Sequence, residues 1–194
     1  MIEPESKFRE KYRVPSNRLK GYDYSSEGVY FITICTKNCE NYFGEIVEGK
    51  MVLNEIGKVA DRFLREIPDH FQNVSIGEYV IMPNHVHIVI MIGLGCSVEI
   101  RPSVETRQCL VSTSGSNPKP SRFQNQGKGT ISAIVGSYKS ICTKTINTMQ
   151  ENVFFAWQPN YHDHIIRDED ELNRIRQYIV DNPLQWEYDE DYRE

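Results

Sequence analysis

The 194-residue sequence predicts an α+β sandwich in which helices cover one side of an antiparallel β-sheet. Strand-like and helix-like segments follow one another in the order strand, hairpin, helix, strand pair, helix, short strand and helix. Strands joined by a tight turn pair antiparallel, and this accounts for the type of sheet. The length and a hydrophobic content of 39% suit one compact domain.

The first half of the chain predicts a strand, a hairpin and a helix. VYFITICT at 29–36 is rich in β-branched and aromatic residues, which favour strands. YFGEIVEGKMVLN at 42–54 predicts a hairpin that turns at Glu48-Gly49. Asn54 then precedes a helix that ends at Pro68. The apolar face of this helix comprises Ile56, Val59, Ala60, Phe63, Leu64 and Ile67.

The run VSIGEYVIMPNHVHIVIMI at 74–92 predicts two strands around Pro83-Asn84. The strands cover 74–81 and 85–92. Both faces of the second strand are apolar, so we expect it in the centre of the sheet.

The second half predicts an insertion followed by two helices. Residues 93–129 are rich in Gly, Ser, Asn, Pro and Gln, which indicates a flexible loop or insertion. Residues 130–149 have helical spacing. Asp168 can cap the last helix, with Glu171 reaching back as in a capping box, and Pro183 ends it. The buried stripe of that helix comprises Leu172, Ile175 and Ile179.

The ends of the chain and its charge add little about function. Residues 1–20 are polar and charged, so we expect a flexible arm. The net charge is −5, yet residues 101–150 hold seven basic residues against one acid, and residues 168–194 hold ten acids against three arginines. This distribution is compatible with a local anion-binding face, and an ordinary solvated surface explains it equally well.

No stretch approaches the ~20 apolar residues that a transmembrane helix needs, so we expect no membrane partner. The charged N-terminus MIEPESKFREKYR argues against a secretory signal. The five cysteines form no CxxC pair, which favours reduced thiols and a cytoplasmic location. Cys35 and Cys39 could belong to a metal site, but the usual zinc spacing is missing.

His85 and His87 stand two residues apart in the run IMPNHVHIVI, so a strand places both side chains on one face. Two imidazoles on one face can bind the same metal ion. The alternative is a pair of core histidines with satisfied hydrogen bonds. Burying two such rings without partners is costly, so either reading requires a specific environment.

Tyr178 and Asn182 are four residues apart on the last helix and share a face. Tyr178 can be a reactive phenol, or a core aromatic whose hydroxyl reaches the rim. Tyr138 and Cys142 have the same spacing on the preceding helix and form a rival pair.

The motifs MPNHVH, WQPNYHDHIIRDEDEL and YIVDNP, in this order, resemble the single-tyrosine HUH transposases, in particular the REP-associated branch. DYSSEGVYFITICTKN and FGEI also resemble the first strands of that family. The resemblance covers roughly residues 22–92 and 130–186. It implies an HUH transposase domain at 21–194 with a ferredoxin-like sandwich, in which the HVH strand is central.

The resemblance also implies roles for single residues. His85 and His87 would bind a divalent metal, Mg²⁺ or Mn²⁺, and Tyr178 would be the nucleophile. Asn182 would be a further metal ligand, at a position where many relatives have Gln. His164 would orient the site or contact DNA.

The activity implied is that of a transposase, a single-strand endonuclease and strand transferase. It would cleave and rejoin hairpin-bearing single-stranded DNA through a 5′-phosphotyrosine, as DNA transposition and recombination require. Lys139, Lys144 and Arg167 are candidates to hold phosphates. The aromatic residues that can stack on bases, or else belong to the core, are Phe154, Phe155, Trp157 and Tyr161. We lean slightly toward a homodimer.

Two alternatives remain open from the sequence. The first is a single-stranded nucleic-acid-binding protein that descends from such an enzyme and has lost catalysis. The second is a small metal-dependent hydrolase in which water attacks and Tyr178 only positions the substrate.

Overall fold

The computed structural model describes residues 7–8, 11–12, 26–93, 129–149 and 154–188. The predicted flexible arm at 1–20 lies outside these residues, apart from the two-residue strands β1 (Lys7–Phe8) and β2 (Lys11–Tyr12), which pair with each other. The predicted insertion at 93–129 also lies outside them, apart from its first and last residues.

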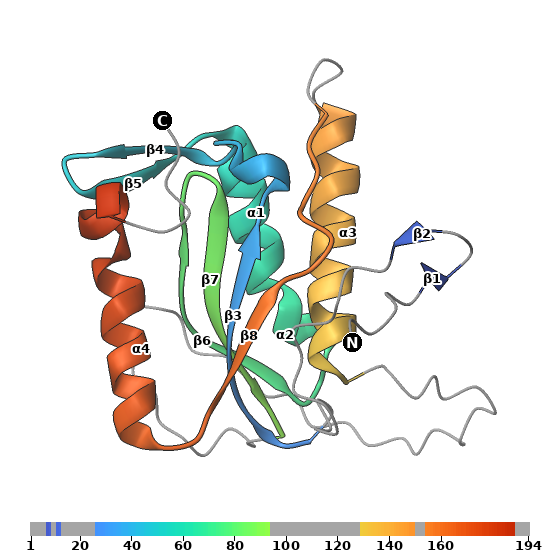
Figure 1. The fold of residues 1–194 in the computed structure, drawn as a ribbon, viewed down its shortest axis with the longest axis vertical. Coiled ribbons are helices and arrows are strands. Elements are labelled where there is room, and N and C mark those ends of the chain that lie inside the picture. The colour runs from blue at the N-terminus through green and yellow to red at the C-terminus, as the bar shows by residue number, and fades with distance from the viewer. Residues whose placement is uncertain (1–6, 9–10, 13–25, 94–128, 150–153, 189–194) are drawn as a thin grey trace, which may run out of the picture.

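The described residues form a four-stranded antiparallel sheet in the order β6-β7-β3-β8 (Figure 1). Along the chain its elements run strand, helix, strand, strand, helix, strand, which is the ferredoxin-like pattern. The predicted α+β fold is therefore confirmed, and so is the order of its elements. The strands are β3 (Gly28–Cys35), β6 (Val74–Ile81), β7 (His85–Ile92) and β8 (His162–Ile166).

Helices α1, α2 and α3 cover one face of the sheet, as the sequence predicts. Their apolar side chains form the main core with every second residue of β3 and β7, such as Ile32 and Ile88. The helices are α1 (Glu55–Arg65), α2 (Ile67–His70) and α3 (Ile131–Met149).

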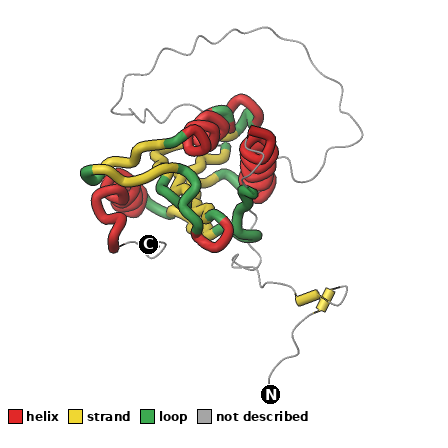
Figure 2. Tube along the Cα trace, turned by 90° about the horizontal axis from the view of Figure 1, so that it is seen from above, coloured by secondary structure: helices red, strands yellow, loops and turns green. Residues whose placement is uncertain are grey.

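The last helix, α4 (Glu169–Asp181), lies against the opposite face of the sheet (Figures 1 and 2). Ile179 of α4 is buried there with Val89 and Met91 of β7 and with Ile166 of β8. These strand residues alternate with those of the main core, so the two faces of β7 face different helices. All eight residues of β7 are buried, which confirms its predicted central place.

Local sequence signals explain where most elements begin and end. Asn54 caps α1, because its side chain accepts a hydrogen bond from the Gly57 amide at 2.9 Å. Between β4 (Gly44–Val47) and β5 (Lys50–Leu53), Glu48 and Gly49 both have positive φ, 50° and 72°, as a two-residue hairpin turn requires.

Two prolines act differently from expectation. Pro68 does not stop α1, which already ends at Arg65; it lies in the first turn of α2, where a missing amide proton costs nothing. Pro183 follows the end of α4 as predicted, yet the chain continues directly as a 3-10 helix, η2 (Asn182–Tyr188). Among the described helices, none is long and apolar enough to cross a membrane.

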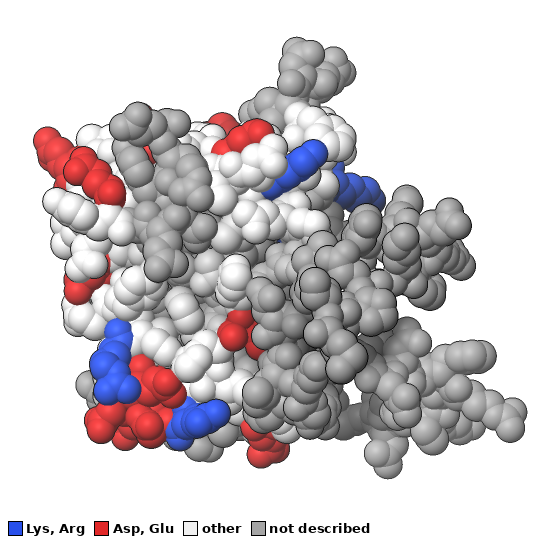
Figure 3. Space-filling model, in the orientation of Figure 1, with Lys and Arg blue, Asp and Glu red and all other residues white. Residues whose placement is uncertain are grey.

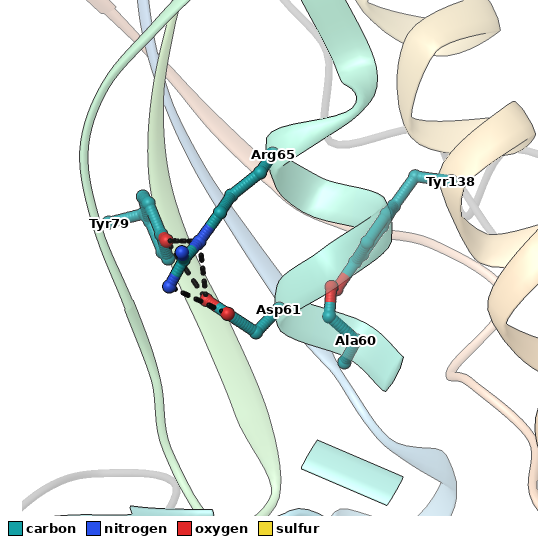
Figure 4. Close-up of polar contacts among 5 residues, drawn as sticks. All are labelled: Ala60, Asp61, Arg65, Tyr79 and Tyr138. Atoms are coloured by element: carbon teal, nitrogen blue, oxygen red, sulfur yellow. Dashed lines mark hydrogen bonds and ion pairs between the residues drawn. The ribbon is translucent and has the colours of Figure 1, made fainter. Parts of the chain in front are cut away.

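A polar cluster ties α1 to the edge strand β6 (Figure 4). The Tyr79 hydroxyl donates to Asp61 Oδ1 at 2.9 Å and accepts from Arg65 Nε at 2.8 Å. The Arg65 guanidinium also pairs with the Asp61 carboxylate at 2.7 Å. The phenol therefore joins an ion pair on α1 to the sheet.

Replacing Tyr79 with phenylalanine should lower the free energy of unfolding by about 1 kcal/mol, since it removes one partly buried and one exposed hydrogen bond and keeps the ring. Urea denaturation of the variant measures this change. Tyr188→Phe is the matched control, because Tyr188 is 88% exposed. Equal stability of the two variants would show that the cluster contributes nothing to folding.

Candidate functional site

Strand β7 places both predicted histidines on the face that α4 covers. His85 and His87 are buried, and their ring centroids are 4.4 Å apart. Both belong to the same alternating series as Val89 and Met91, which pack against α4. The strand period therefore brings the two imidazoles together, as the sequence predicts.

Asn84 holds the ring of His85. Its amide nitrogen donates to the Cys39 carbonyl at 3.0 Å, so its Oδ1 atom is the one that faces His85 Nδ1, at 2.9 Å. An amide oxygen only accepts hydrogen bonds, and His85 Nδ1 must therefore carry the proton. In the neutral ring this leaves the lone pair on Nε2, the atom that can bind a cation.

His87 is held in a similar way by the neighbouring strand. Its Nδ1 lies 2.9 Å from the Thr33 hydroxyl of β3, and the ring of Phe31 stacks on it with centroids 5.3 Å apart. Burial lowers the pKa of His87 well below its usual value, and the nearby His85 lowers it further. The ring is therefore neutral at physiological pH, which is the form that binds metals.

Helix α4 carries Tyr178 to the same place. Its hydroxyl lies 3.3 Å from His87 Nε2, and the two rings are 5.3 Å apart. The Phe31 ring meets the tyrosine ring edge-on at 6.1 Å. The residue remains 42% exposed, so the tyrosine is both beside the histidines and accessible from solvent.

The 3-10 helix η2 closes the other side of His85. Its first residue, Asn182, is buried one turn after Tyr178. Farther along, the Trp186 ring lies 5.9 Å from the His85 ring. From the sequence alone, Trp186, Thr33 and Phe31 were not identified as site residues. Thr33 and Phe31 lie in a stretch that indicated only a strand, and Trp186 follows the last recognised motif.

His164 lies on the same face of the sheet as His85 and His87, but its ring contacts Glu171 of α4 instead of the two histidines. It is opposite Phe31 in the register of β3 and β8. Its Nε2 is 2.8 Å from Glu171 Oε1, and that carboxylate also accepts from the Arg167 amide at 2.9 Å. The Arg167 amide, and then His164, hold the pKa of Glu171 below its usual value. His164 thus connects β8 to the start of α4.

The basic residues predicted to hold phosphates are separated in space. Lys139 and Lys144 lie on α3, on the opposite side of the sheet from Tyr178. The Lys139 ammonium donates to the backbone carbonyls of residues 158–160, and burial lowers its pKa to about 8. Arg167 is exposed beside the start of α4. Of these candidates, Arg167 alone adjoins α4, since it lies between β8 and that helix.

Trp157 was predicted either to stack on bases or to belong to the core, and the structure places it in the core. Its ring packs against Phe43 and Phe155, and its indole nitrogen donates to the Lys139 carbonyl at 3.2 Å. Tyr161 is partly buried against the same core. Phe154, in contrast, is exposed, with the Lys37 ammonium 5.9 Å from its ring centre.

The rival pair, Tyr138 and Cys142, is also buried in the core. The Tyr138 hydroxyl donates to the Ala60 carbonyl at 3.2 Å (Figure 4). Burial raises the pKa of Tyr138 well above its usual value and that of Cys142 to about 12. Neither group is accessible or ionised, which leaves Tyr178 as the better nucleophile.

The residues at the site suit a divalent metal, but with few protein ligands. In the described part of the chain, no three His, Cys, Asp or Glu residues are grouped to hold an ion. Two imidazoles and the Asn182 amide form a sparse set of nitrogen and oxygen donors, which leaves room for water and a substrate oxygen. This composition fits a divalent cation in a site that also receives substrate.

Comparison with known proteins agrees with the fold. No family model matches the chain. It is 41% identical over 177 residues to a Haemophilus influenzae protein described as uncharacterized, covering 91% of this chain and 92% of that protein. A REP-associated tyrosine transposase bound to a REP hairpin has a similar structure, with a TM-score of 0.51 and 16% identity over 88% of this chain and 74% of that one. A candidate transposase from Deinococcus radiodurans aligns with a TM-score of 0.40 and 18% identity, over 84% and 95% of the two chains.

Proposed function

The chain belongs to the same family as the Haemophilus influenzae protein and has the fold of a tyrosine transposase, and from these premises we propose that it is a transposase-type DNA-nicking enzyme. It cleaves and rejoins single-stranded DNA through a 5′-phosphotyrosine on Tyr178. The substrate carries a hairpin, by analogy with the DNA bound to the similar structure.

One observation carries this proposal. The Tyr178 hydroxyl lies 3.3 Å from Nε2 of His87, although 91 residues separate the two in sequence. This tyrosine keeps 42% of its surface exposed, while the two imidazoles beside it are buried. An accessible phenol next to paired metal-binding groups is suited to attack on a phosphodiester.

His85, His87 and Asn182 would hold Mg²⁺ or Mn²⁺. When bound, the ion reduces the negative charge of the scissile phosphate and aligns it. Asn84 and Thr33 keep the two rings oriented through Nδ1, so that each Nε2 faces the site. His87 cannot bind the ion and accept the tyrosine proton with the same atom, so the proton leaves through the exposed side of Tyr178 to solvent.

In the reaction, Tyr178 Oη forms a bond to phosphorus while the bond from phosphorus to the 3′ oxygen breaks. The 3′ oxygen takes up a proton and leaves as a 3′-OH. The phosphotyrosine retains the energy of the phosphodiester, so a second 3′-OH can displace Tyr178 and rejoin the strand without ATP.

The site assembles within a single chain. Helix α4 packs on its own sheet through Ile179, and this contact places Tyr178 beside its own His87. The proposed chemistry therefore does not need a second subunit. The homodimer remains a separate prediction, which the chemistry neither requires nor tests.

The proposal is tested by mixing the protein with single-stranded oligonucleotides that carry hairpins, in the presence of Mn²⁺. We expect an adduct that survives SDS, together with a released fragment that ends in a 3′-OH. Cleavage without any protein-linked nucleotide would instead identify the metal-dependent hydrolase. Binding without cleavage would identify the inactive DNA-binding protein.

Replacing Asn84 with alanine should weaken Mn²⁺ binding by about 10–100-fold, because His85 loses the group that fixes its tautomer and orientation. Titration calorimetry measures this affinity. Asn160→Ala is an exposed control. Unchanged affinity in Asn84→Ala would show that the ring needs no such support.

A further inference from the structure

A second recess adjoins the candidate active site. A pocket of about 520 Å³ lies between the β4–β5 hairpin, the turn at Pro83 and the 3-10 helix η2. Figure 1 shows this hairpin beside the C-terminal end of α4, at the end of the sheet where β7 begins. None of the chemistry proposed above uses this pocket.

Two residues connect the pocket to the histidines. Trp186 lines the pocket and also packs its ring 5.9 Å from the ring of His85. Pro83 lines it as well, and the next residue, Asn84, holds His85 Nδ1. A single side chain therefore separates the pocket from His85. A DNA strand whose phosphate lies at Tyr178 would bring a neighbouring base to this pocket.

The apolar walls suit a flat ring. They consist of Ile46 from the hairpin, Pro83, and Pro183, Leu184 and Trp186 from η2. Leu184 is 70% exposed at the rim, where it also lies over the turn at Gly49. An exposed leucine beside a pocket is available for contact with a ligand, and apolar and aromatic side chains provide stacking surfaces for nucleobases.

The polar groups of the pocket favour a base rather than a phosphate. Glu45, Glu187 and Asn41 line it, and none of its described lining residues is Lys or Arg. Acidic side chains gather over the hairpin end of the molecule in Figure 3. Carboxylates repel the DNA backbone but accept hydrogen bonds from exocyclic amino groups, which cytosine, adenine and guanine have and thymine lacks.

We propose that this pocket binds one single-stranded nucleobase with an exocyclic amino group, next to the phosphate that Tyr178 attacks. The pocket thereby contributes to the choice of the cleavage position. This inference rests on the proposed function, since that function brings the strand to the site.

The main experiment uses a pool of hairpin oligonucleotides with randomised single-stranded flanks. Both the attached and the released fragments are sequenced after reaction with Mn²⁺. The wild-type protein should deplete thymine at one position close to the cleaved phosphate. Leu184→Trp fills the rim and should remove that preference. Val52→Trp changes a 50% exposed hairpin position that does not line the pocket, and it should keep the preference. The same base preferences in wild type and Leu184→Trp would overturn the proposal.

A second measurement separates this proposal from the proposed function. If the pool gives no adduct, the nuclease assignment fails, and the pocket is then tested alone with the four deoxynucleosides, which carry no phosphate. Amide NMR shifts of Gly44 and Gly49 should respond more to deoxycytidine, deoxyadenosine and deoxyguanosine than to thymidine. Leu184→Trp should abolish the response. Absence of any shift in the wild-type protein would overturn the pocket assignment.

Discussion

Replacing Tyr178 with phenylalanine should abolish the covalent protein–DNA adduct while single-stranded DNA still binds. The change removes one oxygen atom and keeps the ring between Phe31 and His87. Because this oxygen is the proposed nucleophile, we expect adduct formation to fall by at least ~10³-fold. The hydroxyl is partly exposed, so the stability of the fold should change little.

SDS gels measure the adduct, and fluorescence anisotropy measures the affinity for DNA. Tyr188→Phe is the control, since that tyrosine lies on η2 and is 88% exposed. An adduct formed by Tyr178→Phe at the wild-type rate would assign the nucleophile to another residue. Loss of both adduct and binding would give Tyr178 a role in holding DNA instead.

Replacing His87 with alanine should remove metal binding together with the reaction. His85 and His87 supply the two imidazole nitrogens of the proposed metal site, and a single imidazole with an amide binds Mg²⁺ or Mn²⁺ poorly. We expect the Mn²⁺ affinity to fall by at least ~10²-fold and the adduct to disappear at the metal concentration that saturates the wild-type protein.

Calorimetry gives the affinity independently of any DNA chemistry. His70→Ala is the matched control, because His70 is an exposed histidine on α2. Tyr178→Phe should bind Mn²⁺ as the wild-type protein does, which separates the metal ligands from the nucleophile. Full activity of His87→Ala, or of the wild-type protein in excess EDTA, would exclude a metal-dependent reaction.

Periodicity was enough to predict which residues share a face. The two-residue period of a strand places His85 and His87 on one face, and the helical period places Tyr178 and Asn182 on one face. That these two pairs meet was implied only by the resemblance to the transposase family. Capping chemistry at Asn54 and Asp168 also located the starts of α1 and α4 correctly. These features depend on neighbours within a few residues, and the sequence contains such information directly.

The features that could not be predicted depend on contacts between distant segments. The apolar stripe of α4 shows which side of the helix is buried, but not which face of the sheet receives it. The sequence left Trp157 open as a base-stacking residue or a core residue, and its packing against Phe43 and Phe155 shows that it belongs to the core. Thr33 contacts His87 because β3 pairs with β7 in the sheet, although 54 residues separate the two in sequence.

The two halves of the site belong to parts of the fold that should open at different rates. The histidines lie on β7, which is buried along its whole length and hydrogen-bonded on both sides, so its amides should exchange with solvent among the slowest. Helix α4 has a single fully buried residue, and local unfolding should release it first. Mild denaturant should therefore detach the phenol from an intact pair of imidazoles, so that catalysis is lost while the two histidines stay in place.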